Sequence, residues 1–149
     1  MSRILAVAVL LATISACDDP VLPRHVPCND FLLSLNPVVP DTVEIANGIR
    51  YVDVSVGAGA EAVNGKVVDV NYTLYVDDQA VDSSCPEFRS VFTVVLGASG
   101  GALPSFKAGI VGMRQGGLRR VFIPEGQGYT TGSLANEPLT FDIEVVTVH

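Results

Sequence analysis

The chain has 149 residues, of which 48% are hydrophobic, and this is enough for one domain with a buried core and an additional tail. Its formal net charge is −7, from 9 basic and 16 acidic side chains. We therefore do not expect nucleic acid as a partner, because binding to phosphates requires a basic surface.

The first sixteen residues have the pattern of an export signal. Arg3 gives a short basic start, and the apolar run Ile4–Ile14 is too short to cross a bilayer as a helix. The run leads into Ile14-Ser15-Ala16-Cys17, which resembles the lipobox of bacterial lipoproteins, where the cysteine is diacylated and becomes the first residue. We predict a lipoprotein signal peptide over residues 1–16 and lipidation at Cys17. The alternative is a buried strand or core helix that ends in a cysteine by chance.

Lipidation at Cys17 would place the protein outside the cytoplasm, because two acyl chains anchor a protein stably to a membrane. Removal of residues 1–16 takes away Arg3 and leaves a net charge of 8 − 16 = −8. The predicted location is therefore a bacterial membrane, with the protein facing the periplasm or the cell exterior. Asp18 resembles an inner-membrane retention signal, but that rule varies between lineages, so both membranes stay open.

Residues 17–43 are predicted to form a spacer between the lipid and the domain. This stretch has no sustained periodicity and contains five prolines, which favour an extended chain: Pro20, Pro23, Pro27, Pro37 and Pro40. Phe31-Leu32-Leu33 is its one apolar cluster. This triplet either docks on the domain or forms only a short turn, and the sequence does not decide between the two.

Cys28 and Cys85 are the two cysteines that remain after Cys17 is acylated. In an oxidising compartment two such thiols are expected to pair, so we predict a Cys28–Cys85 disulfide. Two buried free thiols are the alternative, because the geometry of a disulfide cannot be derived from sequence.

Beyond residue 44 the sequence changes to short alternating runs that are typical of antiparallel strands with one buried face. In Val67–Tyr75 the residues Val68, Val70, Tyr72 and Leu74 share one face, and Asp77-Asp78 then predicts a hairpin turn. Leu139–Val148 alternates in the same way. The full set of predicted strand segments is Ile49 with Tyr51 and Val52–Val56, Val67–Tyr75, Ala80-Val81, Val91–Leu96, Leu118–Ile123 and Leu139–Val148.

One segment has helical spacing. Pro104 suits a first helical turn, Phe106, Ile110 and Met113 follow at i, i+4 and i+7, and Gly116-Gly117 is expected to end the helix. The prediction is therefore an α+β domain over residues 44–149, in which a twisted antiparallel β-sheet wraps around one short α-helix.

Several motifs follow one another in a fixed order along this domain. They are Gly65-Lys66 before a strand ending in Tyr72-Thr73, Asp82-Ser83-Ser84, Phe92 to Leu96-Gly97, Ala102-Leu103-Pro104-Ser105-Phe106, Gly109, Met113, Gly116-Gly117, Arg119-Arg120, Ile123-Pro124, Tyr129, and Leu139 to Val145. Taken in order, they resemble the FKBP family of peptidyl-prolyl cis/trans isomerases, and the resemblance covers about Glu44 to Val148.

The resemblance implies an isomerase that binds the proline of a polypeptide substrate in an apolar pocket, assists the folding of extracytoplasmic proteins, and acts as a monomer without a cofactor or metal. Six residues would form the catalytic set: Tyr72, Asp82, Phe92, Phe106, Tyr129 and Phe141. Three more would contact the substrate: Val81, Ala102 and Leu103. Ordinary core packing is the alternative for the apolar members, and a local turn contact is the alternative for Asp82.

Three departures from the family pattern affect the expected activity. Val81 and Ala102 are smaller than the family residues, Phe106 replaces the usual Trp, and the segment from Thr130 to Pro138 is shorter than the usual loop. A wider pocket would hold proline less tightly. The competing interpretation is therefore a binding module or chaperone of the same fold with little isomerase activity.

Other chemistries lack the residues they need. The two histidines are His25 in the spacer and His149 at the end of the sequence, so a Ser-His-Asp hydrolase is not expected. Gly97–Gly101 is glycine-rich, but the Lys-Ser/Thr of a phosphate loop does not follow it. The sequence also has no cluster with zinc-ligand spacing.

Overall fold

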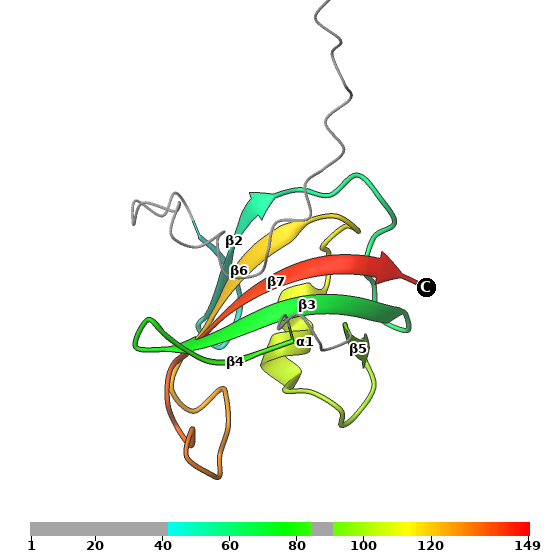
Figure 1. The fold of residues 1–149 in the computed structure, drawn as a ribbon. Helices are drawn as coiled ribbons and strands as arrows, with labels where there is room; N and C mark the ends of the chain where they lie inside the picture. Colours follow the sequence, from blue (N-terminus) through cyan, green and yellow to red (C-terminus); the bar gives the residue numbers. More distant parts are fainter. Residues whose placement is uncertain (1–41, 85–90) are drawn as a thin grey trace, which may run out of the picture.

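A computed structural model describes residues 42–84 and 91–149. This part of the chain folds into a seven-stranded antiparallel sheet with one α-helix, which confirms the predicted fold class (Figure 1). In chain order the elements are β1 (Val43–Ala46), β2 (Ile49–Ser55), β3 (Val67–Val76), β4 (Gln79–Ser83), β5 (Phe92–Val95), α1 (Pro104–Ile110), β6 (Leu118–Ile123) and β7 (Leu139–Val148). The predictions for residues 1–41, with Cys17 and Cys28, and for Cys85 lie outside the described residues.

The sheet has the strand order β1-β2-β6-β7-β3-β4. The long strand β3 pairs along one edge with β7, while its other edge pairs with β5 through Val67–Val70 and with β4 through Thr73–Val76. Consecutive strands form the pairs β1–β2, β3–β4 and β6–β7, whereas the pairs β2–β6 and β3–β7 join strands that are far apart in the sequence. This topology brings β2, β6 and β7 beside the helix, and aromatic side chains of β3 and β5 contact Phe106 of α1.

Two tight turns close the hairpins at the edges of the sheet. Asp77-Asp78 connects β3 to β4 with positive φ at both residues (48° and 61°), as the sequence predicted. Asn47-Gly48 connects β1 to β2 in the same way (55° and 78°). The sequence prediction missed β1, although Asn-Gly between alternating residues is a strong hairpin signal.

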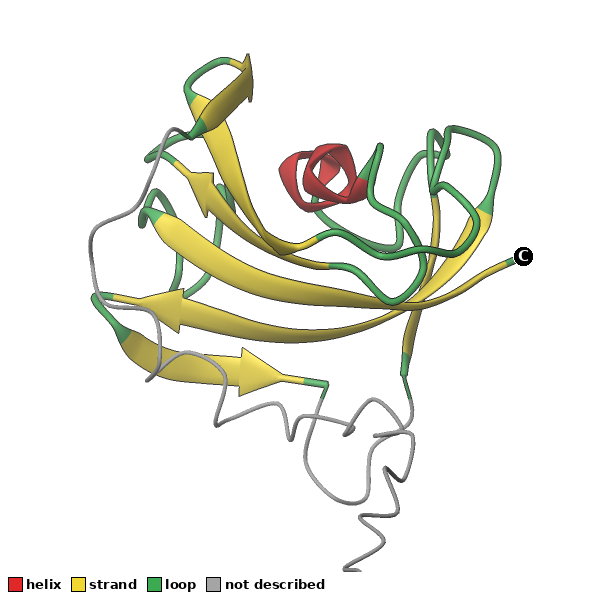
Figure 2. Ribbon diagram, turned by 90° about the horizontal axis from the view of Figure 1, so that it is seen from above, coloured by secondary structure: helices red, strands yellow, loops and turns green. Residues whose placement is uncertain are grey.

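Helix α1 lies in the concavity of the curved sheet (Figure 2). It begins at Pro104, as predicted, but ends at Ile110 and not at Gly116-Gly117. Val111 leaves the helical conformation (ψ 132°) and Gly112 adopts φ +82°. Met113 is nonetheless 3% exposed, so its apolar spacing reflected burial in a loop and not a continuation of the helix.

The core lies between α1 and the sheet. The predicted apolar residues of β3 and β7 face inward, and α1 adds Phe106 and Ile110. The predicted alternation with an exposed polar face is only partly correct, because Asn71, Thr73 and Asp142 are also buried. The buried hydrophobic residues are Ile49, Ala62, Val68, Val70, Leu74, Val94, Leu96, Phe106, Ile110, Met113, Val121, Ile123, Leu139, Phe141, Ile143 and Val145. Among the described residues, none of the helices is long and apolar enough to span a membrane.

The buried Arg119 fixes the C-terminal end of α1 against the sheet. Its guanidinium forms a bidentate ion pair with Asp53, at 2.7 Å and 3.1 Å, and lies 3.7 Å from the centre of the Tyr51 ring. The same group donates hydrogen bonds to the carbonyls of Gly109 (3.0 Å) and Val111 (3.2 Å). These carbonyls lie at the helix end, where backbone acceptors lack partners within the helix. Arg119 therefore sets the position of the helix.

Candidate active site

Four aromatic side chains from four different elements meet at one end of the helix. The Tyr72 ring of β3 lies 5.5 Å from the Phe92 ring of β5, 5.6 Å from the Phe106 ring of α1 and 6.0 Å from the Phe141 ring of β7. The Phe106 and Phe141 rings are 4.8 Å apart and meet edge to face. Aromatic pairs favour such geometries, so each ring helps to fix the others.

These rings form the base and sides of a cavity of about 380 Å³. Phe106 and Phe141 are almost completely buried, whereas Tyr72, Phe92 and Tyr129 are partly open to solvent. The lining residues are Tyr72, Phe92, Gly101, Ala102, Leu103, Pro104, Phe106, Tyr129 and Phe141. Small-molecule sites are typically concave and mostly apolar with a few polar groups, as this one is.

Asp82 lies at the rim, where it is tied to Tyr72. Its Oδ2 accepts a hydrogen bond of 2.7 Å from the Tyr72 hydroxyl, and its Oδ1 accepts the backbone N–H of Ser83 at 2.9 Å. Ser84 Oγ in turn accepts the backbone N–H of Tyr72 at 2.9 Å. The stretch Asp82-Ser83-Ser84 therefore holds the Tyr72 ring and its hydroxyl in place.

Tyr129 contributes the second polar group of the cavity. Burial raises the pKa of its phenol, and the negative charge of Asp82 raises it further. The hydroxyl therefore keeps its proton at neutral pH and can donate a hydrogen bond. The backbone carbonyl of Tyr129 accepts the N–H of Asn136 at 2.8 Å, so the shortened loop after the tyrosine folds back onto it.

The structure thus brings together seven of the nine site residues predicted from the sequence, and it places Asp82 beside them at the rim. Val81 does not line the cavity and is 47% exposed. The β3–β4 register shifts between Leu74 and Tyr75, which leaves Val81 without a partner on β3. A bulge of this kind redirects a side chain, and sequence periodicity does not reveal it.

Sequence reasoning also missed residues that the site uses. Gly101 and Pro104 line the cavity on either side of Ala102-Leu103. Only their position next to these two predicted site residues could have indicated this from the sequence. Ser84 and Arg119 act by positioning Tyr72 and α1, and the sequence shows them only as parts of motifs. Long-range contacts of this kind leave no periodic signal.

The described residues contain no group of three or more His, Cys, Asp and Glu side chains that could hold a metal ion. His149 contacts Asp69 Oδ2 at 2.9 Å on the sheet and does not line the cavity. What the cavity offers is an apolar, aromatic surface with a neutral hydroxyl and a carboxylate at its edge. Such a surface can bind a small apolar ring and hold an adjoining carbonyl.

Known proteins resemble this chain both in sequence and in fold. An FK506-binding protein of Neisseria meningitidis serogroup B is 30% identical over 107 residues, which cover 68% of this chain and 97% of that protein. The chloroplastic peptidyl-prolyl cis-trans isomerase FKBP16-1 of Arabidopsis thaliana is 30% identical over 133 residues. These residues cover 75% of this chain but 63% of the plant protein, so this chain spans less than two thirds of that relative.

Solved structures give the same result. The crystal structure of a peptidyl-prolyl cis-trans isomerase from Pseudomonas syringae pv. tomato matches with a TM-score of 0.62 at 25% identity, over 74% of this chain and 83% of that one. FkpA from Escherichia coli also matches with a TM-score of 0.62 at 25% identity, over 72% of this chain and 51% of that one. The model of the FKBP-type peptidyl-prolyl cis-trans isomerase family matches residues 59–146, and the chain belongs to this family.

Proposed function

We propose that the chain is a peptidyl-prolyl cis/trans isomerase that binds the proline ring of a polypeptide in the aromatic cavity. The observation that carries the proposal is the packing of Tyr72, Phe92, Phe106 and Phe141 around one cavity, with Asp82 and Tyr129 at its edge. Each side chain comes from a different part of the sequence, and the family relationship supports the same activity.

The cavity can lower the barrier to rotation without an acid, a base or a metal. Rotation about an X-Pro bond costs about 18–20 kcal/mol, because amide resonance gives the bond partial double-bond character. The twisted amide has lost this resonance and is less polar than the planar form, so an apolar cavity stabilises it relative to the ground state. A reduction of the barrier by about 7 kcal/mol gives a rate increase of roughly 10⁵-fold.

The residues divide this work between them. Phe106 and Phe141 form the surface against which the proline ring packs, and Ala102 and Leu103 form one wall. The protonated Tyr129 hydroxyl donates to a substrate carbonyl at the edge of the cavity. Asp82 orients Tyr72 through its 2.7 Å hydrogen bond and keeps that ring in the wall.

We further propose that the domain works outside the cytoplasm, tethered by acylation at Cys17. The export signal over residues 1–16 and the run Ile14-Ser15-Ala16-Cys17 support this location, and the proline-rich spacer gives the domain reach from the membrane. Unfolded exported proteins would be its substrates. A Cys28–Cys85 disulfide would join the spacer to the segment that follows Ser84.

An isomerase assay on peptides with an apolar residue before proline tests the activity. Phe106→Ala should cost most of the rate because it removes the base of the cavity, Asp82→Ala should cost less, and Tyr129→Phe least because it deletes one hydroxyl. Val81→Ala serves as the control, because Val81 lies outside the cavity. A folded wild-type protein that gives no acceleration, yet suppresses aggregation of an unfolded client, would instead be a binding module.

Two measurements test the tether. Cys17→Ser should leave the precursor unprocessed and unlipidated, and the intact mass of membrane-extracted wild-type protein should show an acylated Cys17. Thiol titration under denaturing, non-reducing conditions should find no free thiol if Cys28 and Cys85 are paired. Two free thiols per acylated chain would contradict the disulfide.

A further inference from the structure

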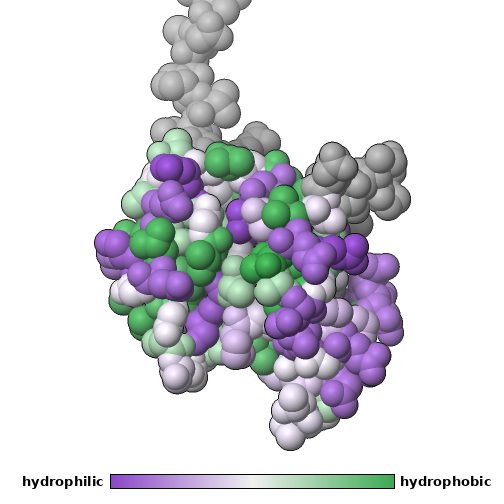
Figure 3. Space-filling model, turned by 180° about the vertical axis from the view of Figure 1, so that it is seen from behind, coloured by the Kyte–Doolittle hydropathy of each residue, from purple (hydrophilic) through white to green (hydrophobic). Residues whose placement is uncertain are grey.

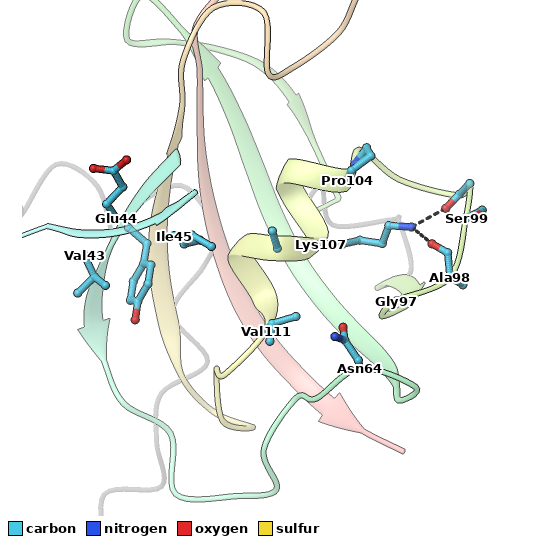
Figure 4. Close-up of a pocket in the computed structure, with 13 residues that line it drawn as sticks. Val43, Glu44, Ile45, Asn64, Gly97, Ala98, Ser99, Pro104, Lys107 and Val111 are labelled. Carbon is cyan, nitrogen blue, oxygen red and sulfur yellow. Dashed lines mark hydrogen bonds between the residues drawn. The ribbon is translucent and has the colours of Figure 1, made fainter. Parts of the chain in front are cut away.

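A second and larger cavity, of about 690 Å³, lies beside α1, between the helix and the edge of the sheet formed by β1 and Tyr51 of β2. Its floor is the outer face of the helix with Pro104, Lys107 and Ala108, together with Val111, which follows directly after the helix. Strand β1 forms one wall, and the loop Gly97–Gly100 with Asn64 forms the other (Figure 4). We call this cavity the outer groove.

Most of the outer groove is apolar and open to solvent. Val43 is 50% exposed, Ile45 39% and Val111 37%, and all three line it. The space-filling view from the helix side shows apolar side chains at the surface, interleaved with polar ones (Figure 3). A volume of this size lies within the range of about 300–1,000 Å³ that is typical of ligand pockets.

Lys107 gives one end of the outer groove a positive charge. The residue is 7% exposed, and its Nζ donates hydrogen bonds to the carbonyls of Ala98 and Gly100, the second at 2.9 Å. Within the described part of the chain no carboxylate forms an ion pair with it, and the Glu44 carboxylate on the opposite wall points away from it (Figure 4). A buried ammonium gains stability from a carboxylate partner.

We propose that the outer groove is the docking site of the chain's own segment Asp30-Phe31-Leu32-Leu33. The chemistry of the segment matches that of the groove, because one carboxylate precedes three apolar side chains. Asp30 would pair with Lys107, and the apolar triplet would cross the outer face of α1 towards Val43 and Ile45.

The length of the chain permits this arrangement. Nine residues, Ser34 to Thr42, separate Leu33 from Val43, which itself lines the outer groove. An extended chain of this length reaches up to about 33 Å, whereas a seven-residue helix is roughly 10 Å long. The short link keeps the segment at an effective concentration on the order of millimolar beside the groove, so even weak contacts suffice for docking.

Docking would also bring the domain closer to its anchor. With the segment free, 25 residues separate Cys17 from Val43, and with the segment docked, 12 residues separate Cys17 from Asp30. This consequence rests on the proposed acylation of Cys17. The docking itself depends neither on acylation nor on isomerase activity, so its test stands apart from both.

Site-specific photocrosslinking in the full chain tests the proposal. p-Benzoylphenylalanine in place of Phe31 should, on irradiation, join to the outer face of α1 between Lys107 and Val111, as located by mass spectrometry of peptides. The same probe in place of Val21, nine residues before Asp30, should give no single cross-linked site. A cross-link to a second copy, a cross-link elsewhere on the domain, or a scattered pattern would overturn the proposal.

Two substitutions test the matched chemistry. Asp30→Asn should lower the yield of the cross-link about fivefold, because it removes the charge that pairs with Lys107. Asp41→Asn, which changes an acid of the same spacer outside the segment, should leave the yield unchanged. Val111→Asp alters an exposed position, so the domain stays folded, and it should abolish the cross-link. A yield that neither Asp30→Asn nor Val111→Asp lowers would contradict docking in the outer groove.

Discussion

The inner and outer faces of α1 differ in the contacts that their side chains make. The inner face packs Phe106 and Ile110 against the sheet, and both side chains are almost completely buried. On the outer face Lys107 lies beneath the loop Gly97–Gly100, and Val111, directly after the helix, is exposed on the same side. Both faces belong to one helix of seven residues without a side-chain cap at its N-terminus.

So short a helix has little stability of its own, because isolated helices of fewer than about 12 residues are marginal in water. Its position therefore depends on tertiary contacts, which are apolar packing on the inner face, the hydrogen bonds from Arg119 at the C-terminal end and those from Lys107 to the loop Gly97–Gly100. Phe106 forms the base of the catalytic cavity, so the same contacts also set the geometry of the site. Changes to the two faces should have effects of very different size.

The largest effect is expected on the inner face. Ile110→Ala removes three methyl or methylene groups from a position with no exposed surface and should lower the free energy of unfolding by about 3 kcal/mol. Val111→Ala, at the adjacent and exposed position, should cost under about 1 kcal/mol. Urea unfolding followed by circular dichroism measures both. Equal losses would contradict the difference between the two faces.

The next effect concerns the helix end. Arg119→Met breaks the ion pair with Asp53 and leaves the carbonyls of Gly109 and Val111 without their donor, so we expect a loss of about 2–3 kcal/mol. Arg114→Met is the matched control, because Arg114 pairs with Glu61 at 3.4 Å on the surface and should contribute under about 1 kcal/mol. Isomerase activity should fall with Arg119→Met only, since that change alone releases α1.

The inner face is also the part of the domain that the sequence predicted best. The inward-facing apolar residues of β3 and β7, the hairpin turn at Asp77-Asp78 and the helix start at Pro104 all agree with the structure. These features depend on local rules, because buried faces repeat with the period of the element and turns need particular residues. The positions of the aromatic site residues followed from family motifs on these elements.

Features that depend on contacts between distant residues could not be predicted in this way. The redirected Val81 results from a bulge, and the early end of α1 results from the turn at Gly112 and from hydrogen bonds to Arg119. The outer groove needs β1 beside α1, whereas the sequence pattern predicts that Val43 belongs to the spacer. Tertiary packing decides such features, and it leaves no periodic pattern in the sequence.

A smaller effect should follow from Gly109→Ala, because Gly109 packs directly against Val121 of β6. A Cβ at this position would lie 2.7 Å and 2.9 Å from the two methyl groups of the buried Val121. Within a helix, alanine is more favourable than glycine by about 1 kcal/mol, whereas overpacking against Val121 costs about 1–3 kcal/mol. The net result should therefore be a loss of stability of about 1 kcal/mol. Ala108→Gly on the outer face should cost about 1 kcal/mol through helix propensity alone. A more stable Gly109→Ala protein would show that α1 can move away from the sheet.

The smallest effect is expected away from the helix, where β3, β5 and the end of β7 meet. Hydrogen bonds from the Thr93 hydroxyl (2.5 Å) and from His149 lower the pKa of Asp69 below its ordinary value of 3.8. A carboxyl whose pKa is lowered by folding stabilises the fold above its unfolded pKa, and this contribution is lost as pH falls through the folded pKa.

Asp69→Asn should therefore cost less than about 1 kcal/mol at pH 7, because solvent screens the pair. The difference from wild type should be complete above about pH 4 and should disappear at lower pH. Urea unfolding at a series of pH values, with Glu125→Gln as a control at an exposed acid, measures this dependence. A difference that grows as the pH falls would show that Asp69 does not stabilise the fold as a carboxylate.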